Sequence, residues 1–170
     1  TLLIALAIIA VMTIWYKGRK IMNRYIEFVS IKNFIPMLTE LSKDDSIEKY
    51  ATHLVYMTKV KELTQVESPI LYSILHKRPK RADFYWFVNI EVTDEPYTME
   101  YKVITIEKND IYKVQFRLGF RVQQKISIYL KSVIREMVEN KEIDLDPHYH
   151  AYVDKKSIGD FRYVLVEEEM

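Results

Sequence analysis

The chain has 170 residues, 49% of them hydrophobic and 13% aromatic, with a formal net charge of +1 at pH 7. It contains no cysteine, which excludes a disulfide framework and any cysteine-based nucleophile or metal site. Because the net charge is close to zero, the chain as a whole does not attract nucleic acid, and any anion site has to be a local cluster of basic residues.

The first 16 residues are an uncharged, mostly apolar run, and basic residues follow it at once. An excess of Lys and Arg is typical of the cytoplasmic flank of a transmembrane helix, and Trp and Tyr favour the membrane interface. We therefore predict that residues 1–20 form the end of a transmembrane helix in the cell membrane, with the chain in the cytoplasm after about residue 17. The predicted membrane-interface residues are Trp15, Tyr16, Lys17, Arg19 and Lys20.

Two other interpretations of the apolar run remain. A signal peptide carries its positive charges before the apolar stretch, whereas here they follow it. A buried helix of a soluble domain can also be apolar, but this run lacks the polar stripe of a surface helix. Because a full span needs about 20 apolar residues, we expect the chain to begin partway through the last transmembrane helix of a larger protein.

Residues 21–49 are predicted to form a juxtamembrane helix and a linker. The helix continues to about Phe28, and a short helix is expected at Asn33–Leu41 with Pro36 in its first turn. The polar run Ser42–Lys49 reads as a loop. We therefore place the boundary of a globular domain at this loop, with the cytosolic α/β domain at residues 50–170.

Within residues 50–170, strands alternate with helices. Ser68 is expected to cap the first helix, with Pro69 in its first turn, and the second helix has one apolar stripe. The expected strands are Thr52–Thr58, Asp83–Val92, Met99–Ile106, Ile111–Leu118 and Phe161–Val166, and the expected helices are Ser68–Leu75 and Ile126–Val138. The pattern predicts an α/β fold with a mixed sheet of about five strands and flanking helices.

The third and fourth of these strands are predicted to form a hairpin through the turn Glu107–Asp110. In its second strand, apolar residues alternate with polar ones. We expect the side that carries Lys113, Gln115 and Arg117 to face solvent and the other side to be packed.

Two basic groups are candidates for an anion site, the first being Arg78, Lys80 and Arg81 and the second Arg117 and Arg121. The second group ends a strand just before a helix. Ligands of α/β sheets bind beyond the carboxyl ends of strands, and helix N-termini attract phosphate. The alternative is that both groups are solvated charged turns.

Other chemistry is not evident in the sequence. His148 and His150 have a spacing that suits a metal, but no third ligand is apparent. The three glycines are far apart, so they cannot form a glycine-rich phosphate loop. We therefore predict no metal, no cofactor and no enzymatic activity.

The order of these segments resembles the C-terminal end of the Kup (KUP/HAK/KT) potassium-uptake family. This chain departs from the usual family pattern at two positions. Ala51 replaces the usual glycine, and Leu118 replaces the usual tyrosine. The resembling segments are YATHLVYMT at Tyr50–Thr58, SPILYSIL at Ser68–Leu75, the long apolar strand at Phe84–Val92 and RLGFR at Arg117–Arg121.

The resemblance implies that the whole protein imports K⁺ in symport with H⁺, with its ion site among other transmembrane helices. It also implies that the cytosolic domain is a regulatory and dimerising module with a fold similar to the universal stress proteins. Some Gram-positive members are inhibited by cyclic di-AMP. The residues that this implies for phosphate binding are Arg78, Lys80, Arg81, Arg117 and Arg121, and those for stacking on adenine are Tyr56, Tyr85 or Tyr97.

We accordingly expect a homodimer that contacts the membrane and the rest of the transporter, and no nucleic-acid partner. A purely structural dimerisation domain that binds no ligand is the alternative function.

Overall fold

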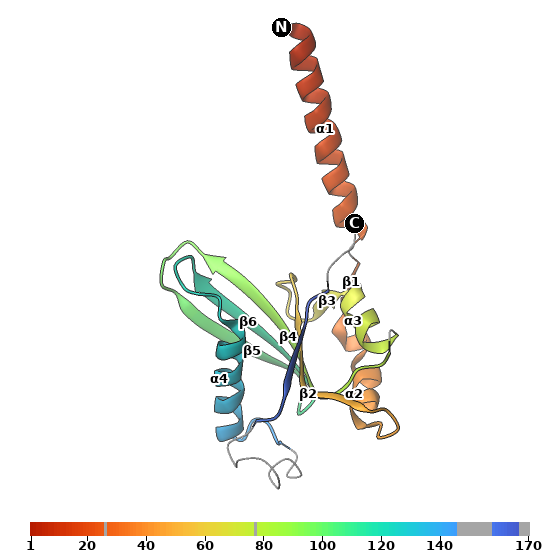
Figure 1. Cartoon of the computed structure of the whole chain (residues 1–170), viewed down its shortest axis with the longest axis vertical. Coiled ribbons are helices and arrows are strands. Elements are labelled where there is room, and N and C mark those ends of the chain that lie inside the picture. The colour runs from red at the N-terminus through yellow and green to blue at the C-terminus, as the bar shows by residue number, and fades with distance from the viewer. Residues whose placement is uncertain (26, 77, 146–157, 167–170) are drawn as a thin grey trace.

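The computed structural model describes residues 1–25, 27–76, 78–145 and 158–166, and it shows one long helix that leads into an α/β domain (Figure 1). The helix, α1, projects away from the domain. The elements in chain order are α1 (Leu2–Tyr25), β1 (Phe28–Ser30), the 3₁₀ helix η1 (Ile31–Asn33), α2 (Ile35–Lys43), β2 (Lys49–Met57), β3 (Gln65–Glu67), α3 (Ser68–Leu75), β4 (Arg81–Thr93), β5 (Met99–Glu107), β6 (Ile111–Gly119), α4 (Ile126–Glu139) and β7 (Phe161–Val164).

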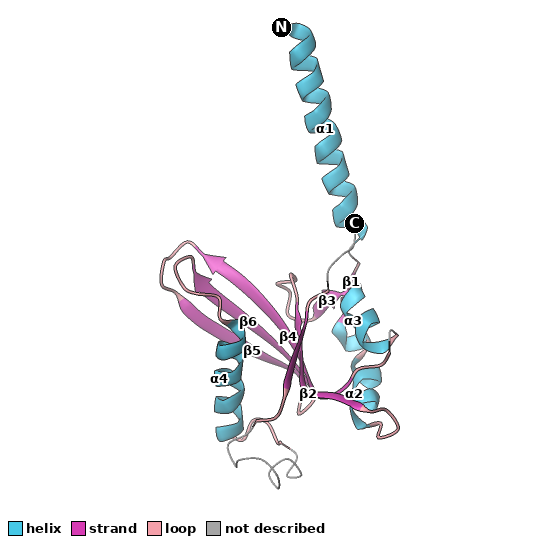
Figure 2. Ribbon diagram, in the orientation of Figure 1, coloured by secondary structure: helices cyan, strands magenta, loops and turns pink. Residues whose placement is uncertain are grey.

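The main sheet has five strands in the order β5-β6-β4-β2-β7. Strands β6, β4, β2 and β7 run parallel to one another, and β5 runs antiparallel to β6. Helix α4 covers one face of this sheet, and α2 and α3 cover the other (Figure 2). The predicted mixed α/β fold with flanking helices is therefore confirmed.

Both faces of the central strands are buried. Consecutive residues of a strand point to opposite faces, so Trp86 packs in the cluster beneath α4 while its neighbours Tyr85 and Phe87 pack beneath α2 and α3. A strand that is covered on both faces has no need of polar alternation. This explains why β4 is apolar and aromatic through most of its length.

Residues 28–49 contribute to this core. Ile31, Leu38 and Leu41 are buried in the same cluster as Leu54 of β2 and Ile74 of α3. The segment that the sequence suggested as a linker thus supplies β1, η1 and α2 to the folded domain. These elements are short, and their place in the domain becomes evident only from the packing of their side chains in its core.

Two local predictions were wrong. Helix α3 begins at Ser68, so its N-cap residue is Glu67, and no side chain caps the helix. Strand β6 lies inside the sheet between β5 and β4. Lys113, predicted to face solvent, is only 1% exposed because the segment that carries Glu62 and Gln65 covers it and accepts its hydrogen bonds. Arg117, on the same side of the strand, is exposed.

His53 of β2 joins three strands through its buried imidazole. Its Nε2 donates to the carbonyl oxygen of Ile158 at 2.6 Å, and its Nδ1 accepts from Nε1 of Trp86 at 3.1 Å. The ring stacks on Phe84 and Phe161, with centroids 5.1 and 4.5 Å away. Burial lowers the pKa of His53 from 6.5 to about 4, although the bond to Ile158 opposes this change.

The neutral form of His53 is therefore expected to stabilise the domain. Unfolded chains take up the proton near pH 6.5 and folded chains only near pH 4, so the free energy of unfolding should fall as the pH is lowered through this interval. Denaturant titrations between pH 7 and 4 measure this slope. The variant His53→Gln should lose part of it, whereas His76→Gln, at an exposed position, should retain it; equal slopes in all three proteins would contradict the assignment.

Gly119 allows the turn after β6 to approach the turn before β5. Its N–H donates to the carbonyl oxygen of Thr98 at 2.7 Å, and a Cβ at this position would lie 2.5 Å from the backbone carbonyl of Pro96. Real Cβ atoms essentially never come so close to backbone atoms, so the two turns would have to separate.

Replacing Gly119 by alanine should therefore destabilise the domain by about 1–3 kcal/mol, the usual cost of overpacking. The matched control is Gly18→Ala in α1, where an added Cβ would meet nothing within 4 Å. Chemical denaturation of both variants checks this prediction, and an unchanged midpoint for Gly119→Ala would refute the close approach.

Candidate functional site

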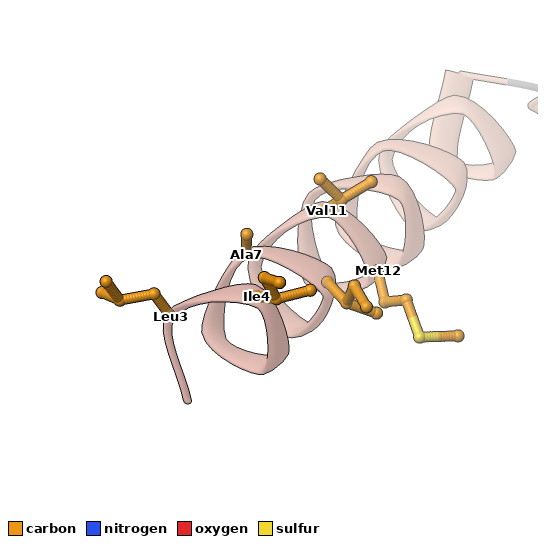
Figure 3. A pocket seen from close by; sticks show the side chains of 6 residues that line it. Leu3, Ile4, Ala7, Val11 and Met12 are labelled. Carbon is orange, nitrogen blue, oxygen red and sulfur yellow. The ribbon is translucent and has the colours of Figure 1, made fainter. Parts of the chain in front are cut away.

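Helix α1 is exposed along its apolar length. Within the residues that the structure describes, Leu2–Lys20 is the one helical stretch long and apolar enough to cross a membrane. One side of it forms an open apolar hollow of about 440 Å³ (Figure 3), lined by Leu3, Ile4, Ala7, Ile8, Val11 and Met12. Small residues such as Ala7 let transmembrane helices pack closely, so this side suits contact with other helices or with lipid.

The predicted interface residues lie together at the basic end of the span. The guanidinium carbon of Arg19 stands 4.8 Å from the centre of the Trp15 ring, which is cation–π geometry. Trp15 and Tyr16 are both exposed. The cytoplasmic orientation of this end stays a prediction.

The first basic group lies where β4 begins, and two of its side chains, those of Lys80 and Arg81, bind the protein itself. Arg81 donates from Nε to the carbonyl oxygen of Ser42 and from Nη1 to that of Ile47, each at 3.2 Å, and forms an ion pair with Asp45. Lys80 donates to the hydroxyl of Ser73 at 3.3 Å. These bonds fasten the loop between α2 and β2 and the end of α3.

The second basic group lies at the opposite end of the strands, near the carboxyl end of β6. Arg117 pairs with Glu100 at 3.0 Å and approaches Glu91 at 3.8 Å, and Arg121 donates to the hydroxyl of Tyr97 at 3.3 Å. Arg117 is the register partner of Glu91, ten residues along β4 from Arg81. At about 3.3 Å per residue, the two groups are about 30 Å apart, so no single pocket of one chain holds both.

Two of the predicted stacking residues, Tyr56 and Tyr85, are buried in the core, whereas Tyr97 is 70% exposed and accepts the bond from Arg121. Tyr56 lies within hydrogen-bonding distance of the Ser73 hydroxyl at 3.2 Å, and Tyr85 donates to the carbonyl oxygen of Lys80 at 3.0 Å. Burial raises the pKa of Tyr56 to about 12 and also raises that of Tyr85. Both rings are 0% exposed, so stacking on adenine would require the core to open. Their binding role stays a prediction, as does that of the basic groups.

A cavity of about 340 Å³ lies where β2 ends beside β4. It forms because β2 pairs with β4 only as far as Val88, while β4 continues to Thr93. Its lining residues are Met57, Thr58, Lys59, Lys61, Asn89, Ile90, Leu165 and Val166. Its position beyond the carboxyl end of a parallel strand, and its volume, are typical of ligand sites.

Asn89 is the buried polar residue of this cavity. Its Nδ2 donates to the carbonyl oxygen of Thr58 at 2.9 Å, whereas its Oδ1 has no partner among the described residues. The sequence analysis missed this residue because it stands inside the long apolar run of β4. Its position as a lone polar residue inside that apolar run is the signal that could have identified it.

The buried carboxylate of Glu67 connects this cavity to β3. Its Oε2 accepts from the hydroxyl of Thr58 at 2.6 Å, and its Oε1 accepts from the backbone N–H of Lys59 at 2.7 Å. Hydrogen bonds to an ionised group are about twice as strong as neutral ones. Glu67 thus holds β3 against the point where β2 leaves the sheet.

Lys113 of β6 holds the segment between β2 and β3 through hydrogen bonds to its carbonyl groups. Its ammonium donates to the carbonyl oxygen of Gln65 at 3.0 Å and to that of Glu62. Burial lowers the pKa of Lys113, and the nearby carboxylates of Glu67 and Glu62 oppose this change. A buried cation is tolerated here because carbonyl oxygens replace its water.

Main-chain bonds then connect this loop to the end of α1. Strand β3 pairs with β1, the first strand after α1, and both lie at the end of the domain from which α1 leaves (Figure 1). Two more bonds flank this pair, from the N–H of Ile31 to the carbonyl oxygen of Thr64 and from the N–H of Ser68 to that of Glu27, both at 2.9 Å. The cavity and the loop are therefore linked by hydrogen bonds to β1, the first strand after α1.

Replacing Lys113 by methionine should loosen this link while preserving an unbranched side chain. A hydrogen bond to a charged group contributes about 1.5–3 kcal/mol, so amides in residues 59–65 should exchange hydrogen about tenfold faster or more. Hydrogen exchange followed by mass spectrometry measures the effect. The control is Lys102→Met on β5, where the lysine is exposed; if both variants exchange alike, Lys113 does not hold the loop.

The chain belongs to a family of membrane-transport domains. The sequence profile of the family described as "K+ potassium transporter C-terminal domain" matches residues 51–170. The structure adds residues 28–49 to the core of that domain. No solved structure matches the chain, so its likeness to universal stress proteins stays a prediction.

Similar proteins carry the name "Probable potassium transport system protein Kup". That of Cytophaga hutchinsonii is 47% identical over 160 residues, covering 94% of this chain and 24% of the relative. That of Flavobacterium psychrophilum is 48% identical over 168 residues, covering 99% and 26%, and that of Clostridium perfringens 44% identical over 168 residues, covering 99% and 25%. The chain thus spans about a quarter of the length of these relatives.

His148 and His150, which the sequence analysis considered as metal ligands, lie outside the described residues. Among the described residues, no group of three or more His, Asp or Glu side chains is arranged to hold a metal ion.

Proposed function

We propose that the chain is the cytosolic C-terminal part of a Kup potassium transporter, which imports K⁺ in symport with H⁺ at the cell membrane. The observation that carries this proposal is the 47–48% identity to Kup proteins over nearly the whole chain. In this proposal α1 ends the membrane part, and its apolar side packs against other helices of the transporter, which hold the ion site.

The domain has a regulatory role in this proposal, because its sheet is linked to α1 through Glu67, β3 and β1. A ligand that favours one arrangement of the domain shifts the population of transporter states by its difference in affinity for them. A nearly complete switch, from 1:99 to 99:1, needs about 5.5 kcal/mol of such difference.

Cyclic di-AMP is the proposed ligand. Of the predicted residues, Arg117 and Arg121, at the carboxyl end of β6, are the best placed to bind it. Arg117 has a side chain that is 52% exposed, and Arg121 is also exposed. A cyclic dinucleotide has two equal halves, so a two-fold axis between two copies of the chain would present both arginines to each half. This arrangement requires a homodimer.

A purely structural dimerisation domain is the second candidate. It is favoured by the contacts of the predicted ligand residues, because Arg81 already binds Ser42, Ile47 and Asp45, and two of the three tyrosines are buried. In this alternative the arginines stabilise the fold and no nucleotide binds.

Calorimetric titration of cyclic di-AMP into the full chain in detergent tests the choice, with ATP as the control ligand. We expect saturable binding of one cyclic di-AMP per two chains, no binding of ATP, and at least tenfold weaker binding by Arg121→Ala. Arg78→Ala, at the opposite edge, is the matched control and should bind normally. A folded dimer that gives no heat with either nucleotide would leave the structural role as the better account.

A further inference from the structure

Strand β5 forms one edge of the main sheet. It pairs with β6 along one side, and among the described residues no strand pairs with its other side. The opposite edge is β7, which has four residues, whereas β5 has nine. Met99 and Tyr101 of β5 are 58% and 47% exposed. An exposed edge of this length with apolar side chains is a template for pairing with another strand.

The backbone of β5 presents hydrogen-bonding groups at this edge. The N–H of Gly119 donates to the carbonyl oxygen of Thr98, so Thr98 turns its main-chain groups toward β6. Along a strand of an antiparallel pair, successive residues turn these groups to alternate sides, and the β5–β6 register is regular from Met99 to Thr105. Met99, Tyr101 and Val103 therefore turn their N–H and carbonyl groups toward the free edge.

A row of alternating charges crosses the sheet and ends at the same edge. Glu91 of β4 is the register partner of Arg117 of β6, and Arg117 is the register partner of Glu100 of β5. Arg117 stands 3.8 Å from the Glu91 carboxylate and 3.0 Å from that of Glu100. Because opposite charges on neighbouring strands stabilise a sheet, a cation on a further strand would continue this row.

A second copy of β5 supplies that cation. Lys102 is exposed, and its register partner on β6 is the neutral Gln115. When an antiparallel copy of β5 is placed so that Tyr101 faces Tyr101, Glu100 of each copy stands opposite Lys102 of the other. An edge lysine often protects a strand from pairing, but here the same strand carries its complement two residues away.

The neighbouring registers lack this match. A pairing centred on Glu100 places two glutamates opposite each other, and one centred on Lys102 places two lysines in the same way. Like charges directly opposite each other are destabilising. A pairing centred on Val103 places both charges opposite isoleucines. The charges of β5 therefore favour the register centred on Tyr101 over these three.

We propose that two copies of the chain associate through antiparallel pairing of their β5 strands, centred on Tyr101, which joins their sheets into one. This inference rests on the proposed function and deepens it, because it names the surface of the homodimer. A two-fold rotation about an axis perpendicular to the sheet keeps each face on its own side. Arg117 of both copies therefore lies on one face, with Cα atoms about 16 Å apart at ordinary strand spacings, so one symmetric ligand can contact both.

The pairing also allows both copies of α1 to enter one membrane. Neighbouring strands are rotated by about 20–25° relative to each other, and β7 is the fourth strand from β5 in the sheet. Strand β7 is thus turned by about 80–100° and lies within about 10° of the two-fold axis. Figure 1 shows β7 running along the direction of α1, whereas β5 and β6 lie obliquely. A rotation preserves direction along its axis, so both helices leave the dimer on the same side.

Because the chain has no cysteine, single cysteines test the register in the full chain in detergent. Opposed residues of an antiparallel pair have Cα atoms about 4.5–5.5 Å apart, inside the disulfide range of about 4.4–6.8 Å. Tyr101→Cys should therefore form covalent dimers under mild oxidation. Val103→Cys alone should not, because its two copies lie about 14 Å apart along the strands.

A second crosslink keeps Tyr101, whose hydroxyl donates to Glu136 of α4 at 2.8 Å. Met99 of one copy stands opposite Val103 of the other, so Met99→Cys co-expressed with Val103→Cys should form covalent dimers. If Val103→Cys crosslinks alone while neither of the expected pairs does, the register and the role of Lys102 are wrong.

The charge match is tested by Lys102→Glu, which places glutamate opposite Glu100. The dissociation constant of the dimer, measured by light scattering without oxidation, should rise about tenfold or more, since two attractive pairs become repulsive. The matched control is Lys32→Glu, an equal change of charge at an exposed position of η1, which should leave the constant unchanged. Equal constants for both variants would overturn the charge match.

Light scattering of the unmodified chain separates this inference from the proposed function. A dimer that gives neither expected crosslink would show that β5 is not the interface, while the proposed homodimer stands. A folded chain that stays monomeric and gives no crosslink would overturn the homodimer, and this inference with it.

Discussion

The buried carboxylate of Glu67 is the interaction on which the relation between α1 and the sheet depends. It accepts hydrogen bonds from Thr58 and Lys59, where β2 leaves the sheet, and it belongs to β3, which pairs with the first strand after α1. A buried polar group is stable only while its hydrogen-bond donors stay in position. A displacement of Thr58 or Lys59 therefore either breaks these bonds or moves β3, which pairs with β1.

The different lengths of β2 and β4 explain why a cavity forms at this edge. Strand β2 turns away after Met57 toward the loop that Glu67 and Lys113 hold, whereas β4 continues beside β6. Just beyond the last β2–β4 backbone pair, the side chain of Asn89 donates a hydrogen bond to the carbonyl oxygen of Thr58. The same turn that connects the sheet to α1 thus also creates the hollow, so a ligand there would touch the connecting residues directly.

The elements with strong patterns were predictable from the sequence, and those defined by tertiary contacts were not. The sequence predicted three elements from patterns that loops do not have. These are the apolar run of α1, the aromatic residues of β4 and the amphipathic periodicity of α4. The alternation in β6 predicted its two sides but not that the carbonyl groups of Glu62 and Gln65 cover Lys113. The basic clusters were visible as well, but Arg81 pairs with Asp45, which is 36 residues away, and no local pattern reveals such a partner.

The pairing of β1 with β3 is made by main-chain atoms, and this affects how the family can diverge. Side chains at residues 28–30 can change through evolutionary drift without breaking the connection to the sheet, because the N–H and carbonyl groups that carry it are common to nearly all amino acids. Proline is the exception, since it has no N–H to donate. A lineage of this family can therefore change the side chains of this segment and still inherit the same backbone connection to the sheet.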